Sequence, residues 1–232
     1  MTLTAVKAAA YTHHLHHTSP DPERLATFYA DAMEMTAEKH GAGWLVRGPG
    51  RRMIFTKGAA NGLGHVGMGV RDVEGLAELK ARAEKEGLAP KPVNATLFSP
   101  GAFGVTDPDG NLIVFGHARE DKPMKGLRGP LQHVTFATQD IARFQAFYVD
   151  KLGFAVSDTV IRQSDGKVMT VFMRSNHEHH TIGVFFQNRT GVDHHSYEAG
   201  EWGVMKDWCD RFSERHIKLD WGPGRHGPGN NL

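Results

Sequence analysis

A fourfold internal repeat constrains the fold of this sequence more than any other feature. In each copy a short strand-like run with a histidine leads into an amphipathic helical pattern, at residues 11–33, 64–87, 131–154 and 193–217. The first and third copies align without a gap over about twenty positions, which chance similarity rarely produces. The matched pairs are His14 with His133, Asp21 with Asp140, Arg24 with Arg143, and, between the second and fourth copies, His65 with His194. The chain is therefore expected to be built from repeated modules.

Strand-like runs fill the intervals between the helical patterns, and turn residues mark where elements end. The runs cover residues 43–48, 51–56, 111–116, 154–161, 167–173 and 181–187. We expect Asp21 to cap the first helix, Gly87 to close the second, and DPDG at 107–110 to form a tight turn. The order strand, helix, several strands, repeated, predicts an α+β protein. The polar segment 119–130 is the predicted linker between two tandem halves.

Composition narrows the class of function. A net charge of +1 argues against a nucleic-acid footprint or a polybasic membrane patch. No apolar stretch approaches transmembrane length, and the single cysteine, Cys209, fits a reducing compartment, so we expect a cytoplasmic protein. The 15 histidines favour metal or proton-transfer chemistry without locating it.

Alternation along a strand indicates which histidines face a cavity. Residues two apart share a face, so His133 and Thr135 point one way while Val134 and Phe136 point towards a packed helix. The same reasoning predicts two further shared faces: His194 with Ser196, and His180 with Ile182 and Val184. A histidine opposite an apolar face is a candidate for lining a cavity. The run HHLHH at 13–17 is read instead as a strand with solvent-facing or packing histidines.

Four segments, in order, resemble the type I extradiol dioxygenases, the family of catechol 2,3-dioxygenase in the vicinal oxygen chelate superfamily. LQHVTFATQD (131–140) resembles the strand of the first metal ligand, and VDHHSYEAGEW (192–202) that of the second. SNHEHHTIGVFF (175–186) resembles the strand with an acid–base histidine. WGPGRHGPGNN (221–231) resembles a glycine-rich segment whose histidine contacts the catechol. The resemblance covers the whole chain, weakly at first and strongly from Gly129 onwards.

The resemblance implies a vicinal oxygen chelate fold of paired βαβββ modules. Two modules would form a degenerate N-terminal half at 1–118, and two a metal-binding C-terminal half at 131–232, whose last module is incomplete. It also implies an enzyme that opens a catechol-type ring with O2 at non-heme Fe(II), with Mn(II) as an alternative metal. A homo-oligomer is implied in the same way. Which catechol is cleaved stays open.

Site residues follow from the same resemblance. His133 and His194 are the implied metal ligands, His194 being preferred to its neighbour His195, which faces the other way. The implied catalytic histidines are His180, as acid–base group, and His226, which also binds substrate; Thr135, Phe172 and Ile182 are pocket candidates. His177 and His179 are read as loop residues.

The third ligand, a glutamate, is expected beyond Leu232, after a DPDGN-like turn. In the N-terminal half the corresponding position is Val114, which cannot bind a metal, so that half is expected to be inert. Glu198 is the nearest acidic substitute and is read as a pocket or surface residue. As written, the chain is expected to bind iron weakly and turn over poorly.

Two other functions are compatible with the same fold. A glyoxalase-like metal-dependent isomerase would use a metal shell richer in carboxylates than this one. A bleomycin-resistance-type binding protein would have no use for His180 and His226 where they stand. Both are therefore alternatives to the dioxygenase.

Overall fold

The computed structural model describes residues 2–119 and 123–232 and divides the chain into two compact units. The first unit comprises Met1–His13, His65–Glu120 and Gln132–Ser196, and the second comprises His14–Gly64, Asp121–Leu131 and Tyr197–Leu232. Each unit therefore contains residues from both predicted halves. The predicted division into residues 1–118 and 131–232 stays a prediction. Of the predicted linker, residues 120–122 lie outside the described residues, and residues 123–130 contain neither helix nor strand.

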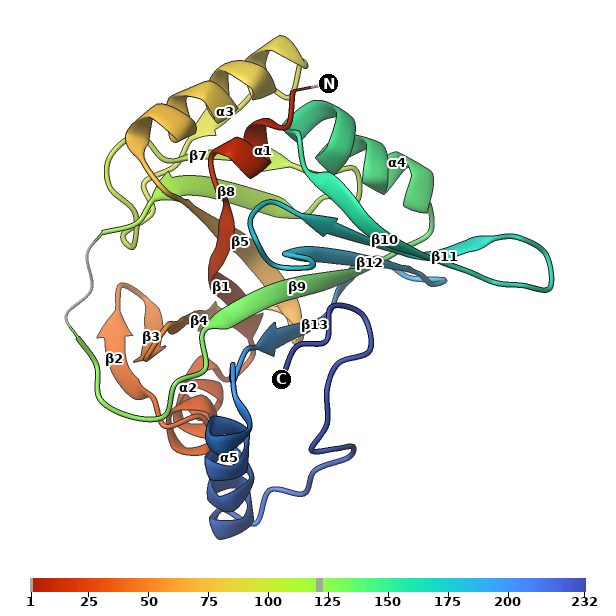
Figure 1. Ribbon diagram of the computed structural model, residues 1–232. Coiled ribbons are helices and arrows are strands. Elements are labelled where there is room, and N and C mark those ends of the chain that lie inside the picture. Colours follow the sequence, from red (N-terminus) through yellow and green to blue (C-terminus); the bar gives the residue numbers. More distant parts are fainter. Residues whose placement is uncertain (1, 120–122) are drawn as a thin grey trace. The chain divides into compact units, whose positions relative to one another are not determined.

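The first unit holds two sets of strands, each with its helix (Figure 1). In one set α3 (Val73–Lys85) packs against β8, and the strand order is β5-β8-β7-β6, with bounds Gly62–Val70, Leu112–His117, Phe103–Thr106 and Lys91–Pro92. In the other set α4 (Ile141–Ala146) packs against β11 and β12 and continues into the π-helix Phe147–Leu152. Its strand order is β10-β11-β12-β9-β13, with bounds Ala155–Ile161, Val168–Arg174, Ile182–Phe186, Leu131–Thr138 and Gly191–Tyr197. The short helix α1 (Thr4–Lys7) completes the unit.

The second unit repeats the same arrangement once. β1 (Tyr11–Ser19, in this unit from His14) leads into α2 (Pro22–Ala32), and the strand order is β2-β3-β4-β1. The bounds of the other three strands are Thr36–His40, Gly43–Gly48 and Arg51–Lys57. After β13 the chain forms α5 (Trp202–Glu214), and the described residues from 215 to 232 contain no strand.

The pairing pattern confirms the predicted βαβββ repeat. In each of three modules the first strand runs parallel to the last, as β1 with β4, β5 with β8 and β9 with β12. The helix starts also repeat, because Asp21 and Asp140 each accept a hydrogen bond, 3.0 Å long, from the backbone N–H three residues later. Gly87 follows α3 with a φ of +70°, as predicted for a residue that closes a helix. The fold class is therefore the vicinal oxygen chelate type.

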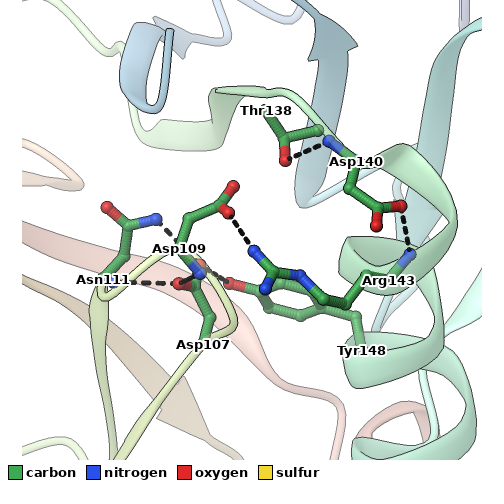
Figure 2. Close-up of polar contacts among 7 residues, drawn as sticks. All are labelled: Asp107, Asp109, Asn111, Thr138, Asp140, Arg143 and Tyr148. Carbon is green, nitrogen blue, oxygen red and sulfur yellow. Dashed lines mark hydrogen bonds and ion pairs between the residues drawn. The ribbon is translucent and has the colours of Figure 1, made fainter.

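A buried polar cluster joins the turn before β8 to α4 (Figure 2). Asp107 accepts hydrogen bonds from the backbone N–H of Asp109 and from both the backbone and the side-chain amide of Asn111. Arg143 donates to Asp109 across 2.9 Å, and the Tyr148 hydroxyl lies 3.4 Å from Asp107. Burial raises the pKa of Asp107 against the opposing effect of the hydrogen bonds from Asn111 and Asp109.

A buried arginine organises the second unit. Arg51 is fully buried and donates to four backbone carbonyls, those of Met33, Glu34, Pro49 and Leu127. Its guanidinium also lies over the ring of Trp208, 4.9 Å from the centroid. The cation thereby ties the predicted linker segment and the end of α2 to the face of α5.

Candidate active site

Three strands of the first unit build one face on which two of the predicted pocket residues, Thr135 and Phe172, lie. Gly183 on β12 is in register with Thr135 on β9 and with Phe172 on β11, so the three share a face of the sheet. The side chain of Thr135 packs closely over Gly183, because an added Cβ would lie 2.9 Å from Thr135 Oγ1. Thr135 is fully buried and Phe172 is 3% exposed.

Three histidines meet beside this face. The ring of His133 lies 4.2 Å from that of His180 and 5.6 Å from that of His194, measured between centroids. His133 and His180 are buried, whereas the side chain of His194 is 43% exposed. The structure thus brings both predicted ligands and the predicted acid–base histidine together. The neighbouring His195 is half-buried.

The protonation pattern of His133 follows from its neighbour. Its Nδ1 lies 2.7 Å from Gln132 Oε1, and an amide oxygen only accepts hydrogen bonds. Nδ1 therefore carries the proton, and the lone pair is on Nε2, which is buried. A neutral imidazole in this form is suited to bind a metal through Nε2.

His194 is held in the same way by a charged partner. Its Nδ1 lies 2.9 Å from Asp193 Oδ2, which again leaves the lone pair on Nε2. Burial alone would raise the pKa of Asp193, but hydrogen bonds from His194 and Gln187 hold it below its ordinary value. Neither partner, Gln132 or Asp193, was predicted from the sequence. Their signal was available, since each immediately precedes a predicted ligand.

His180 reaches the site from a loop, and the predicted alternation there is wrong. Ile182 is in register with Val134, and Val184 with Phe136, so both lie on the face opposite His133. Ile182 is therefore not a pocket residue. The segment 175–181 is not a strand, so the alternation of β12 does not extend back to His180. In this loop the Nδ1 atoms of His179 and His180 lie 3.0 Å apart.

Phe185 is a further aromatic side chain that the sequence analysis did not single out. It is in register with Ala137 and so shares the face of Thr135. Its ring lies 6.2 Å from the ring of His194 and the same distance from that of Phe172. Its place two residues after Gly183 in the same strand was the available signal.

Two candidate residues near the end of the chain, His226 and Glu198, lie in the second unit. His226 Nδ1 lies 2.7 Å from the carbonyl oxygen of Pro228, and its backbone N–H donates to Asn231. Glu198 accepts through one carboxylate oxygen from the backbone amides of Gly200 and Leu232. The roles predicted for both stay predictions.

The donor chemistry fits two positions of a metal centre. Two imidazoles in ring contact, each with Nδ1 bonded to an oxygen acceptor, are the nitrogen ligands that Fe(II), Mn(II) or Zn(II) accept. Among residues 2–119 and 123–232 no group of three His, Cys, Asp or Glu side chains is placed to hold one ion. Within the same residues, no helix has the length and apolar character needed to cross a membrane.

The chain is similar in sequence to known proteins. Residues 131–231 match the model of the Glyoxalase/Bleomycin resistance protein/Dioxygenase superfamily. Biphenyl-2,3-diol 1,2-dioxygenase of Paraburkholderia xenovorans is 30% identical over 153 residues, which are 57% of this chain and 51% of that protein. The enzyme of the same name from Metapseudomonas furukawaii is equally similar. The chain thus spans about half the length of the curated relatives it matches.

Solved structures share the fold over nearly the whole chain. Homoprotocatechuate 2,3-dioxygenase of Arthrobacter globiformis superposes with a TM-score of 0.78 at 20% identity, covering 95% of this chain and 73% of that one. The complex of the Brevibacterium fuscum enzyme with 3,4-dihydroxyphenylacetate gives a TM-score of 0.78 at 19% identity, with 95% and 74% covered. A halotolerant catechol dioxygenase, BphC, gives 0.77 at 18% identity, with 95% and 80% covered.

Proposed function

We propose that the chain, whose residues 131–231 match the model of the Glyoxalase/Bleomycin resistance protein/Dioxygenase superfamily, is an extradiol ring-cleavage dioxygenase of type I. In the proposed reaction the ring carbon–carbon bond beside the two hydroxyls breaks. Both atoms of O2 enter the product, a ring-opened semialdehyde-type acid. The curated relatives and the superposed enzymes act, by their names, on aromatic diols, which favours this reading over an isomerase.

The observation that carries the proposal is the cluster of His133, His180 and His194. Nδ1 of two of these imidazoles is hydrogen-bonded to an oxygen acceptor, which directs Nε2 towards a metal, and the ring of the third lies against the first. His133 and His194 would hold Fe(II), which supplies, when bound, the electron transfer between a catecholate and O2. Mn(II) accepts the same ligands and is the alternative metal.

The side chains around the metal ligands bind and orient the ring. Thr135 and Phe172 flank Gly183 on the same face of the sheet, and we assign both to contacts with the aromatic ring. His180 would hold or move a proton at its Nε2, which is buried. We assign His226 to a substrate hydroxyl from the family resemblance alone. A homo-oligomer is proposed on the same ground.

The test is oxygen uptake after anaerobic loading of the whole chain with Fe(II). We expect uptake that requires both Fe(II) and a catechol and is matched one to one by ring-opened product. His133→Ala and His194→Ala should abolish it together with metal binding. The matched controls His195→Ala and His177→Ala should retain both, because His195 is the neighbour of the proposed ligand and the side chain of His177 is 88% exposed. Iron binding without catechol-dependent uptake would overturn the proposal.

A further inference from the structure

Glu178 is linked to His133 indirectly, through the side-chain amide of Gln132. Its Oε2 accepts a hydrogen bond of 2.9 Å from Gln132 Nε2, while Gln132 Oε1 lies 2.7 Å from His133 Nδ1. Gln132 is 5% exposed, and the Glu178 side chain is 23% exposed. Gln132 and Glu178 are 46 residues apart, so β9 and the loop before β12 meet at this amide.

An amide side chain has two ends of similar shape and opposite hydrogen-bonding character. If the NH2 end faced His133, the ring would have to accept at Nδ1 and would carry its proton on Nε2. If the carbonyl end faces the ring, Nδ1 carries the proton and Nε2 carries the lone pair. The orientation of Gln132 therefore decides which nitrogen of His133 is available to a metal.

Glu178 decides that orientation. A carboxylate oxygen accepts hydrogen bonds and cannot donate them, so the NH2 end of Gln132 must face Glu178 and the carbonyl end must face His133. The backbone N–H of Glu178 donates to Asn176 across 2.9 Å, which holds the loop. His194 needs no such intermediary, because Asp193 accepts from it directly.

We propose that Gln132 and Glu178 are positioning residues that set the tautomer of His133 and leave its Nε2 lone pair for the metal. The inference rests on the proposed function only in taking His133 as a ligand. Supporting acceptors of this kind typically change metal affinity by about 10–100-fold. The same loss is expected when either member of the Gln132–Glu178 pair is altered.

The tautomer can be read without any metal. In long-range ¹H–¹⁵N spectra of the metal-free chain, His133 should appear with its proton on Nδ1. In Glu178→Gln the new amide can accept or donate, so a mixture of both tautomers is expected. His177→Gln is the control, because His177 approaches the other oxygen of Glu178 at 3.5 Å and is exposed. An unchanged His133 tautomer in Glu178→Gln would overturn the proposal.

Exchanging the amide and the carboxylate between positions 132 and 178 should restore metal affinity that each single substitution lowers. Gln132→Glu alone places two carboxylates against each other, and Glu178→Gln alone loses the fixed acceptor. The double variant restores a carboxylate beside His133 and an amide donor beyond it, with the same atoms in contact. Co(II) affinity should fall about 10–100-fold in each single variant. In the double variant it should return to within about threefold of the original, since contacting residues are coupled.

The outcomes separate this inference from the proposed function. If the losses of Co(II) affinity in the two single variants simply add in the double variant, the positioning role is wrong. If His133→Ala left Co(II) affinity unchanged, the ligand assignment and with it the proposed function would fail. The tautomer spectra of the metal-free chain would still decide the inference about Gln132 and Glu178. Circular dichroism identifies any variant whose loss reflects unfolding.

Discussion

The imidazole of His180 lies against that of His133 at an interplanar angle of 38°, and both rings are buried. A proton held by His180 is therefore adjacent to a proposed ligand and shielded from bulk water. The ring of Phe172 also contacts His180, with 4.7 Å between ring centroids. This arrangement suits a group that assists the reaction without binding the metal.

Replacing His180 should separate metal binding from turnover. In His180→Phe we expect Fe(II) affinity within a few-fold of the original, while kcat falls by about 10²–10⁴-fold, the usual contribution of an acid–base group. The aromatic substitution preserves packing against Phe172. His177→Phe, at an exposed loop position, serves as control. Loss of iron comparable to that in His133→Ala would make His180 a ligand instead.

Gly183 should control the space available to the ring of the substrate. Gly183→Ala places a Cβ 2.9 Å from Thr135 Oγ1, so we expect KM for a catechol to rise about tenfold, the effect of one extra carbon in a pocket. Adding Thr135→Ala removes the crowding and should bring KM back towards that of Thr135→Ala alone. Gly203→Ala, whose Cβ meets nothing within 4 Å, should leave KM unchanged. Unchanged kinetics in Gly183→Ala would show that the ring binds elsewhere.

Arg51 should dominate the stability of the second unit. Arg51→Met leaves the carbonyls of Met33, Pro49 and Leu127 without their donor, and we expect a loss of about 3 kcal/mol or more in the free energy of unfolding. Arg47→Met is the comparison, because Arg47 pairs with Glu38 on the surface and should contribute no more than about 1 kcal/mol. Urea denaturation measures both. Equal effects would contradict the role of Arg51.

The raised pKa of Asp107 predicts a particular pH dependence. Because the folded pKa lies above the unfolded value of about 3.9, the protonated form is favoured by folding. The stability of the original chain relative to Asp107→Asn should therefore be greatest below that unfolded value. It should decline as pH rises through the folded pKa and level off above it. Denaturation of both chains from pH 4 to 7 tests this, and a difference that grows with pH would mean that the hydrogen bonds outweigh burial.

The repeat made most of the fold predictable. Gap-free alignment, the capping aspartates and the alternation in β9 depend on local sequence, so His133, Thr135 and the helix starts could be placed in advance. The ring centroids of Phe136 and Phe144 of α4 are 5.5 Å apart, so Phe136 faces a helix as predicted. An amphipathic pattern does not, however, show how far a face is covered. Phe28 and Trp202 belong to apolar stripes and are 54% and 51% exposed.

The rest of the site depends on contacts between distant parts of the chain. The position of His180 is set by a loop, where alternation has no meaning, and this is why Ile182 was placed on the wrong face. The contact between Gln132 and Glu178 has no signature in either segment alone. Only the pairing of β9 with β12 brings the two side chains together.

Val114 makes its position a costly one for a metal ligand. It is fully buried in an apolar cluster with Phe98 and Ala102, and its register partners on either side, Gly67 and Gly104, have no side chains. A single mutation to glutamate would place a carboxylate among hydrocarbon groups, at a cost of several kcal/mol. Engineering a metal centre into this module would therefore require several coordinated substitutions, because the surrounding cluster has to be repacked before a carboxylate is tolerated.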